Sequence, residues 1–262
     1  MKQGYTSEPL SFNRKMVSAS ASVTARKNTI HSMAEVDITE PRRKLKAHFD
    51  KTGQKLSLTA YIVYCLAQVI RDHPQLNSFI RRNRLITLDE VTVSVLIERE
   101  FDGENVPEPV SIKAAQDLTY MQINSQIREA QSDRVHHLGT QHGMSWIRFI
   151  PGFLLRTFIR IADHNLKMAA RYGKVAVTAV GMFSKEPIWF IPHGSGTVLL
   201  TVGSIEKRLE ISETGPGTRE YLCLTASFDH DIVDGAPAAR FMNQFLETLG
   251  SGKYLSMFQD PV

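Results

Sequence analysis

The sequence predicts one mixed α/β domain whose strands gather toward the C-terminal end of the chain. Segments with helical spacing of apolar residues alternate with short runs of β-branched and aromatic residues along the 262 positions. No internal repeat, long linker, phosphate-binding loop or G-x-G-x-x-G fingerprint interrupts this alternation. A hydrophobic content of 42% and a charged content of 22% are typical of a globular chain that can bury a substantial core.

The first half of the chain is predicted to begin with a helix at Ser11, where apolar residues start to recur at helical spacing. A strand at 30–38 is followed by a short basic helix that Thr39 begins. Residues 57–72 are apolar on nearly every side, which indicates a buried central helix that ends before Pro74. The remaining elements of this half are strands at 85–87, 91–97 and 106–112 and a helix at 118–131.

The second half opens with a polar segment and then a cationic, apolar segment at 144–174. In that segment Arg148, Arg156, Arg160 and Lys167 are spaced for one helical face. The clean apolar stripe at 236–249 predicts a last helix, which glycines close. The strands between these two helical regions are predicted at 175–180, 198–202, 205–211 and 221–228, with a turn at 215–217.

The residues that point to chemistry are 221–235, YLCLTASFDHDIVDG. A nearly continuous apolar run, typical of a buried strand, delivers His230 into a turn that closes on Asp234 and Gly235. A histidine at the mouth of a buried strand suggests a positioned base. Cys65 and Cys223 lie inside apolar runs, so we expect both to be buried and reduced.

The stretch FDHDIVDG resembles the H-x-x-x-D-G motif of the chloramphenicol acetyltransferase superfamily, in particular the catalytic domain of the 2-oxoacid dehydrogenase dihydrolipoamide acyltransferases. The resemblance covers residues 11–250 in the right order and spacing. The other segments that carry it are SFNRK, EVDIT, KLSLTAYIVYCLAQVI, HPQLN, VTAVGMF, LLTVGSIEKRL and the final helix.

This resemblance implies a two-layer α/β sandwich with a mixed β-sheet flanked by helices. It also implies a homotrimer with the active site in a channel between subunits. Residues 1–10 would then be an irregular lead-in and 11–255 the acyltransferase catalytic domain, and we expect no lipoyl or peripheral-subunit-binding domain in this chain.

The resemblance also assigns roles to individual residues. His230 is the expected general base, which takes the proton of a thiol so that the thiolate attacks a thioester. Thr178 stands where the family has a serine hydroxyl, and we expect it to stabilise the oxyanion. Asp234 is expected to pair with Arg14 in the opening helix and so hold the active-site loop. Gly235 is expected to allow a sharp turn.

Two features depart from the family pattern. Asp231 stands directly after the histidine, where these acyltransferases usually have arginine, so the field at His230 is more negative. The segment 144–174 is longer and more apolar than its family counterpart. It is either a packed helix pair with solvated arginines or a surface for an anionic membrane or a partner.

These features together predict a CoA-dependent acyltransferase that moves an acyl group between coenzyme A and a dihydrolipoyl-type thiol. Coenzyme A is a substrate here, the lipoyl group would be carried by a separate protein, and lipoyl-carrying or dehydrogenase subunits are the expected partners. The alternatives are a non-catalytic trimeric scaffold of the same fold and an O-acetyltransferase acting on a small hydroxyl substrate.

Other classes of function have less support. The net charge of +4 is too small to indicate nucleic-acid binding, and no signal core or membrane span is present, so we expect a cytoplasmic protein. No metal site is expected, because His136, His137 and His142 lack cysteine or carboxylate at ligand spacing. Trp189 and Phe190 either line a pocket or form core or trimer contacts.

Overall fold

The computed structural model describes residues 4–101, 104–132, 152–181, 184, 186–212 and 215–258. The predictions for Arg148 and for the three histidines between 136 and 142 lie outside these residues. No regular element occurs at residues 4–10.

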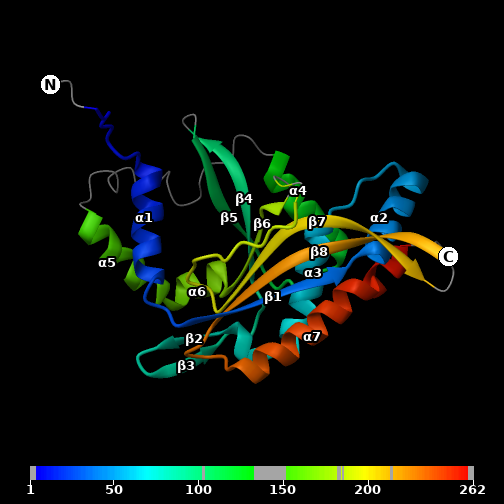
Figure 1. Ribbon diagram of the computed structural model, residues 1–262. Coiled ribbons are helices and arrows are strands. Elements are labelled where there is room, and N and C mark those ends of the chain that lie inside the picture. Colours follow the sequence, from blue (N-terminus) through cyan, green and yellow to red (C-terminus); the bar gives the residue numbers. More distant parts are fainter. Residues whose placement is uncertain are drawn as a thin grey trace.

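A mixed six-stranded sheet organises the molecule, as the fold prediction requires (Figure 1). Its strand order is β1–β8–β7–β6–β4–β5. The pairs β4–β6 and β6–β7 are parallel and the other neighbours are antiparallel. The strands are β1 (Thr29–Asp37), β4 (Val93–Phe101), β5 (Glu104–Ile112), β6 (Val175–Ala179), β7 (Val198–Ser212) and β8 (Gly215–Asp229).

Three helices cover one face of this sheet and form the second layer (Figure 1). They are α3 (Leu58–Arg71), α4 (Tyr120–Ser132) and α7 (Gly235–Ser251). The alternation of side chains along each strand sends the apolar residues of the sheet into this layer, where Phe228 packs edge-on against Phe241. The Tyr61 hydroxyl donates a hydrogen bond to the Leu249 carbonyl over 3.1 Å, which joins α3 to the end of α7.

The remaining elements surround this core. The first helix and α3 begin where the sequence predicts, because Ser11 and Ser57 accept hydrogen bonds from the first-turn N–H groups of Arg14 and Ala60. The remaining elements are α1 (Phe12–Thr24), α2 (Thr39–Thr52), α5 (Gly152–Asp163), α6 (Leu166–Tyr172), the hairpin of β2 (Ser78–Arg81) and β3 (Arg84–Thr87), and the 3₁₀ turns η1 (Pro74–Asn77) and η4 (Lys253–Phe258).

Three sequence predictions are wrong in detail. The predicted strands 198–202 and 205–211 are one strand, β7, whose register shifts between Val202 and Ile205 as in a β-bulge. The predicted turn at 215–217 belongs to β8. The segment 144–174 does not present one helical face, because Asn165 caps a new helix after α5 and so separates Lys167 from Arg156 and Arg160.

Candidate active site

The turn that carries His230 is fixed by main-chain hydrogen bonds on both sides. The His230 N–H donates to the Asn28 carbonyl over 2.7 Å, which joins the turn to the start of β1. The carbonyl of Asp229 accepts the N–H groups of Ile232 and Val233, both over 3.0 Å. The histidine therefore lies on a closed turn between β8 and α7.

The imidazole of His230 has a defined tautomer. Its Nδ1 lies 3.1 Å from the Val233 carbonyl oxygen. Because a carbonyl can only accept, Nδ1 must carry the proton and donate it. The neutral ring then has its lone pair on Nε2, and the side chain is 43% exposed. In this tautomer Nε2 is the ring nitrogen that can accept a proton.

Lys27 and Asp229 form an ion pair beneath this turn that the sequence did not predict. Lys27 Nζ lies 2.8 Å from Asp229 Oδ2 and also donates to the Ser195 carbonyl over 2.7 Å. The second carboxylate oxygen of Asp229 accepts the Asp231 N–H over 3.2 Å. The Asp229 side chain is 8% exposed, so this pair contributes strongly to the position of the turn.

The predicted pair of Arg14 and Asp234 does not form within one chain. Arg14 is exposed on α1, and the Asp234 carboxylate is 86% exposed. The Oδ1 atom of Asp234 lies 3.7 Å from Nδ1 of His230, within its own turn. Asp231 accepts a hydrogen bond from the Asn28 side-chain amide over 2.9 Å and so remains part of the turn.

Gly235 does not have the conformation that the sequence analysis predicted. It is the first residue of α7, its φ lies outside the left-handed region, and a Cβ added there would meet no atom within 4 Å. The backbone of one chain therefore gives no reason for glycine at this position.

Thr178 lies on the sheet face opposite the three covering helices. Its neighbours Val175 and Val177 point into the helix layer, so Thr178 projects to the other side. The strand can approach β7 closely here because Gly181 and Gly203 face each other. A Cβ on Gly181 would lie 1.6 Å from the Gly203 carbonyl oxygen, which is far inside contact distance.

Thr178 is the half-buried end of a row of threonines across three strands. Thr178 pairs with Thr201 on β7, and Thr201 pairs with Thr225 on β8. The hydroxyls of Thr201 and Thr225 are buried and have no hydrogen-bond partner among the described residues. The row makes this face of the sheet polar, a property that no single strand of the sequence reveals.

The same register separates Thr178 from His230 within one chain. Asp229 at the end of β8 is four residues past Thr225, which is roughly 13 Å along the strand. Thr178 is two strands away from β8, about 10 Å across the sheet. A hydroxyl and a base that act on the same carbonyl carbon must approach to a few ångström, so these two residues of one chain do not share a substrate.

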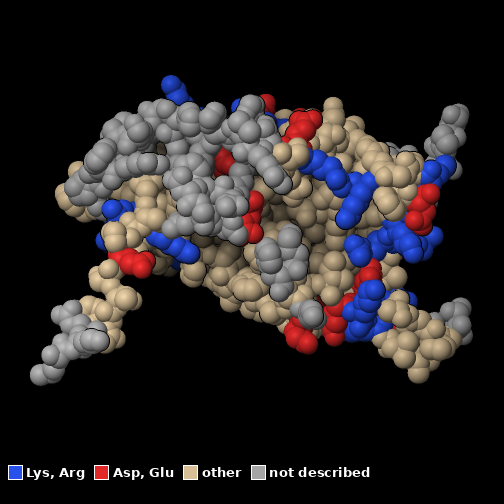
Figure 2. Space-filling view, turned by 90° about the horizontal axis from the view of Figure 1, so that it is seen from above, with Lys and Arg blue, Asp and Glu red and all other residues tan. Residues whose placement is uncertain are grey.

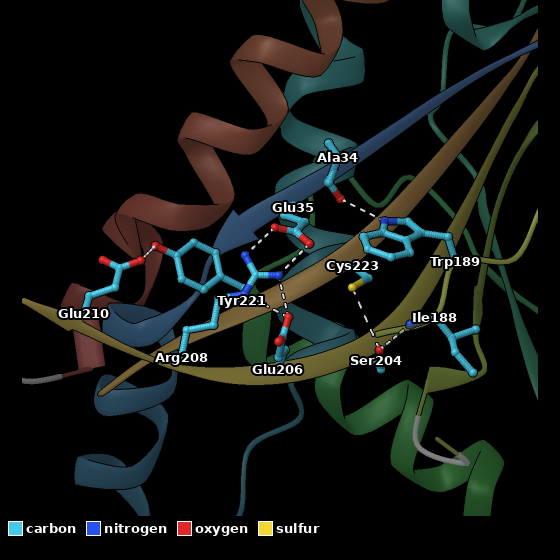
Figure 3. A network of polar contacts seen from close by, with 10 residues as sticks. All are labelled: Ala34, Glu35, Ile188, Trp189, Ser204, Glu206, Arg208, Glu210, Tyr221 and Cys223. Atoms are coloured by element: carbon cyan, nitrogen blue, oxygen red, sulfur yellow. Dashed lines mark hydrogen bonds and ion pairs between the residues drawn. The ribbon is translucent and has the colours of Figure 1, made fainter. Parts of the chain in front are cut away.

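A further polar network extends along β7 and β8 (Figure 3). Arg208 forms two hydrogen bonds to Glu35, of 2.6 and 2.8 Å, and also bonds Glu206. The hydrogen bonds from Arg208 hold the pKa of Glu35 below its usual value. Trp189 is half-buried, with Nε1 3.5 Å from the Ala34 carbonyl, whereas Phe190 is 47% exposed. Trp189 therefore packs on β1, whereas Phe190 lies at the surface.

Neither cysteine offers a competing nucleophile. Cys65 and Cys223 are free and buried, as predicted. Burial raises the pKa of Cys65 to about 12 and also raises that of Cys223. No three metal-ligating side chains cluster within the described ranges. No helix in these ranges is both long and apolar enough to cross a membrane.

Known proteins resemble the chain in sequence. It is 25% identical over 226 residues to the lipoamide acyltransferase component of the branched-chain alpha-keto acid dehydrogenase complex of Bacillus subtilis (strain 168), which covers 84% of this chain and 46% of the relative. The chain therefore spans just under half the length of that protein.

Solved structures resemble it in fold. The dihydrolipoamide acetyltransferase of Azotobacter vinelandii superposes with a TM-score of 0.72 at 15% identity, covering 97% of this chain and 95% of that one. A chloramphenicol acetyltransferase superposes with a TM-score of 0.51 at 14% identity, covering 96% and 99%. These likenesses confirm the predicted fold class.

The family itself is shown by a match along most of the chain. The model of the 2-oxoacid dehydrogenases acyltransferase (catalytic domain) matches residues 2–141 and 163–257. This confirms the resemblance that the motif around His230 indicated. The chain belongs to the family of 2-oxoacid dehydrogenase acyltransferase catalytic domains.

Proposed function

We propose that this protein transfers an acyl group between coenzyme A and a dihydrolipoyl-type thiol, with His230 as the general base. The observation that carries the proposal is the hydrogen bond from Nδ1 to the Val233 carbonyl, because in the neutral imidazole it places the lone pair on Nε2, on a side chain that is 43% exposed. Coenzyme A and the acceptor are both substrates, and the chemistry needs no resident cofactor.

The reaction balances with the groups at hand. Nε2 of His230 takes the proton of the attacking thiol, and the thiolate sulfur bonds to the thioester carbonyl carbon. The Thr178 hydroxyl donates a hydrogen bond to the resulting oxyanion. The intermediate then expels the other thiolate, which takes the proton back from His230, so the transfer is reversible.

A known enzyme supports the choice of residues. The Azotobacter structure belongs to a study of the role of a serine, a histidine and an asparagine in that enzyme's catalytic mechanism. The serine stands fifty-two positions before the histidine and the asparagine four positions after it. Thr178 and Asp234 stand at the same separations from His230. Threonine keeps the hydroxyl, and aspartate keeps an oxygen acceptor.

The separation of Thr178 and His230 within one chain supports a site shared between chains. We propose a homotrimer in which His230 of one chain and Thr178 of a neighbouring chain act on the same carbonyl. The acyl donor or acceptor would be a lipoyl group on a separate lipoyl-carrying protein, and dehydrogenase subunits would be further partners. The Bacillus relative is named for such a complex.

The test is an acyl-transfer assay on the full chain with several acyl-CoA donors and either dihydrolipoamide or small alcohols as acceptors. We expect turnover with the dithiol and a loss of turnover of about 10²–10⁴-fold in His230→Gln. Turnover only with alcohols would support an O-acetyltransferase instead. A folded trimer without turnover on any acceptor would support the scaffold. Mixing His230→Gln chains with Thr178→Val chains should restore part of the activity if the site is shared.

A further inference from the structure

The helices α1 and α5 lie side by side at one end of the molecule, beyond the layer that covers the sheet (Figure 1). Leu155 and Ile159 of α5 pack against Phe12, Met16 and Ala19 of α1. The family match stops at residue 141 and resumes at 163. Almost all of α5 therefore lies in a segment that the family model leaves unmatched.

Apart from Thr157, the side of α5 that faces away from α1 carries exposed apolar side chains. Phe153 and Ile161 are 67% and 64% exposed, and Leu154 and Phe158 are 48% and 38% exposed. At 3.6 residues per turn these four side chains lie within an arc of about 140°. A contiguous exposed face of this kind marks an interaction site.

One edge of this face is cationic. Arg156 and Arg160 lie one turn apart on α5, between the apolar face and the face that packs on α1. Lys and Arg side chains are seen at this end of the surface in Figure 2. The exposed cations of the three helices are Arg14 and Lys15 on α1, Arg156 and Arg160 on α5, and Lys167 and Arg171 on α6.

The described carboxylates do not pair with these cations. None of the six cations forms an ion pair with another described residue. The sequences of α1, α5 and α6 contain one acidic residue, Asp163, and it is buried 2.8 Å from Lys174 Nζ. That pair anchors the end of α5 to the start of β6 and leaves the outer surface positive.

We propose that the α1–α5 face docks on an anionic phospholipid membrane. The apolar side chains of α5 would insert among the acyl chains while Arg156 and Arg160 contact lipid phosphates. With 12 residues, α5 is too short to span a bilayer and would lie in its plane. A second copy of the chain is a poorer occupant, because a symmetric contact would bring like charges together.

The experiment is cosedimentation of the full chain with vesicles of phosphatidylcholine alone or mixed with phosphatidylglycerol. We expect binding to the mixed vesicles only. Phe153→Ser with Phe158→Ser should abolish binding, and Arg156→Gln with Arg160→Gln should weaken it roughly thirtyfold. Matched controls are Leu209→Ser with Ile211→Ser, which are 76% and 87% exposed on β7, and Arg82→Gln with Arg84→Gln on the β2–β3 hairpin.

Each other outcome overturns the proposal. The proposal fails if a control pair loses as much vesicle binding as the α5 variants. It also fails if the wild type binds neutral vesicles equally well or binds no vesicles. If the phenylalanine variant instead dissociates an oligomer that ignores vesicles, the face is covered by a second copy. Circular dichroism establishes that the variants fold. Acyl transfer in solution should be unchanged in the phenylalanine variant, so membrane docking and the proposed activity fail separately.

Discussion

Lys27 and Asp229, which lie 202 positions apart in the sequence, form a 2.8 Å ion pair directly beneath His230. Residues from two segments that are remote in sequence thus stabilise the turn that carries His230. The pair has two further contacts, to the Ser195 carbonyl and the Asp231 N–H. It occupies the supporting role that the sequence analysis assigned to Arg14 and Asp234.

Lys27→Met should lower both the free energy of unfolding and the acyl-transfer rate. The substitution leaves the buried Asp229 carboxylate without its cation, which costs about 3 kcal/mol in urea unfolding. The double variant Lys27→Met, Asp229→Asn should regain part of this loss, because the amide oxygen still accepts from Asp231. Arg26→Met is the neighbouring control, since Arg26 is exposed and forms no ion pair with a described residue. Equal effects of the two single changes would contradict the role of the pair.

Thr178→Val should lower the turnover number by about 10²–10³-fold, while Thr178→Ser should retain most of it. Valine keeps the shape of threonine but removes the hydroxyl that we propose as the donor to the oxyanion. Thr201→Val is the matched control in the same row. Its buried hydroxyl has no partner among the described residues, so its removal should leave turnover unchanged and raise stability by about 1 kcal/mol. Steady-state kinetics and thermal unfolding separate the two effects.

Gly181→Ala and Gly235→Ala should behave in opposite ways. The methyl at 181 would lie 1.6 Å from the Gly203 carbonyl oxygen, so β6 and β7 must separate. We expect a loss of more than about 3 kcal/mol or failure to fold. The methyl at 235 meets open space and φ lies outside the left-handed region, so alanine should stabilise the fold by about 0.4–1 kcal/mol. Melting temperatures of the two variants test this contrast, and a destabilised Gly235→Ala would show that the turn requires glycine.

The ion pair of Glu35 and Arg208 should make the free energy of unfolding depend on pH only below about pH 4.5. The pKa of Glu35 lies below its usual 4.5, so its contribution is complete above that value and is lost as the pH falls through the lowered pKa. The two side chains are about a third exposed, at 30% and 36%, so the contribution is under about 1 kcal/mol. Glu35→Gln should flatten the acid limb of stability against pH. Glu247→Gln, at an exposed carboxylate without a resolved ion pair, should leave it unchanged.

Local signals predicted the helices and strands well. The apolar run of α3 and its serine cap specify that helix, and the β-branched run of β8 specifies a buried strand. The signal for β7 was less clear, because Gly203 and Ser204 interrupt its apolar pattern where the register shifts. The four-residue strand β2 follows a proline turn and has no clear alternation, so it was not predicted.

Contacts between segments that are remote in sequence could not be predicted from such local patterns. His230 was found because its motif is local. Lys27 was not, because a lone lysine after a helix carries no signal until the fold brings it to Asp229. The row of threonines depends on the register of the three strands β6, β7 and β8. The hydrophobic pattern alone does not set this register for residues that face away from the core.

The hydrogen bond from His230 to Val233 has a consequence for how this site can change over time. Both atoms that orient the imidazole plane belong to the same five-residue turn, and the acceptor is a main-chain oxygen. The hydrogen bond that directs Nε2 therefore uses no side-chain atom of residues 231 and 234. The substitutions Asp231→Arg and Asp234→Asn would therefore change the charge beside His230 while keeping the hydrogen bond that orients its imidazole. Selection can then adjust acceptor preference and rate at these positions while the geometry of proton transfer stays the same.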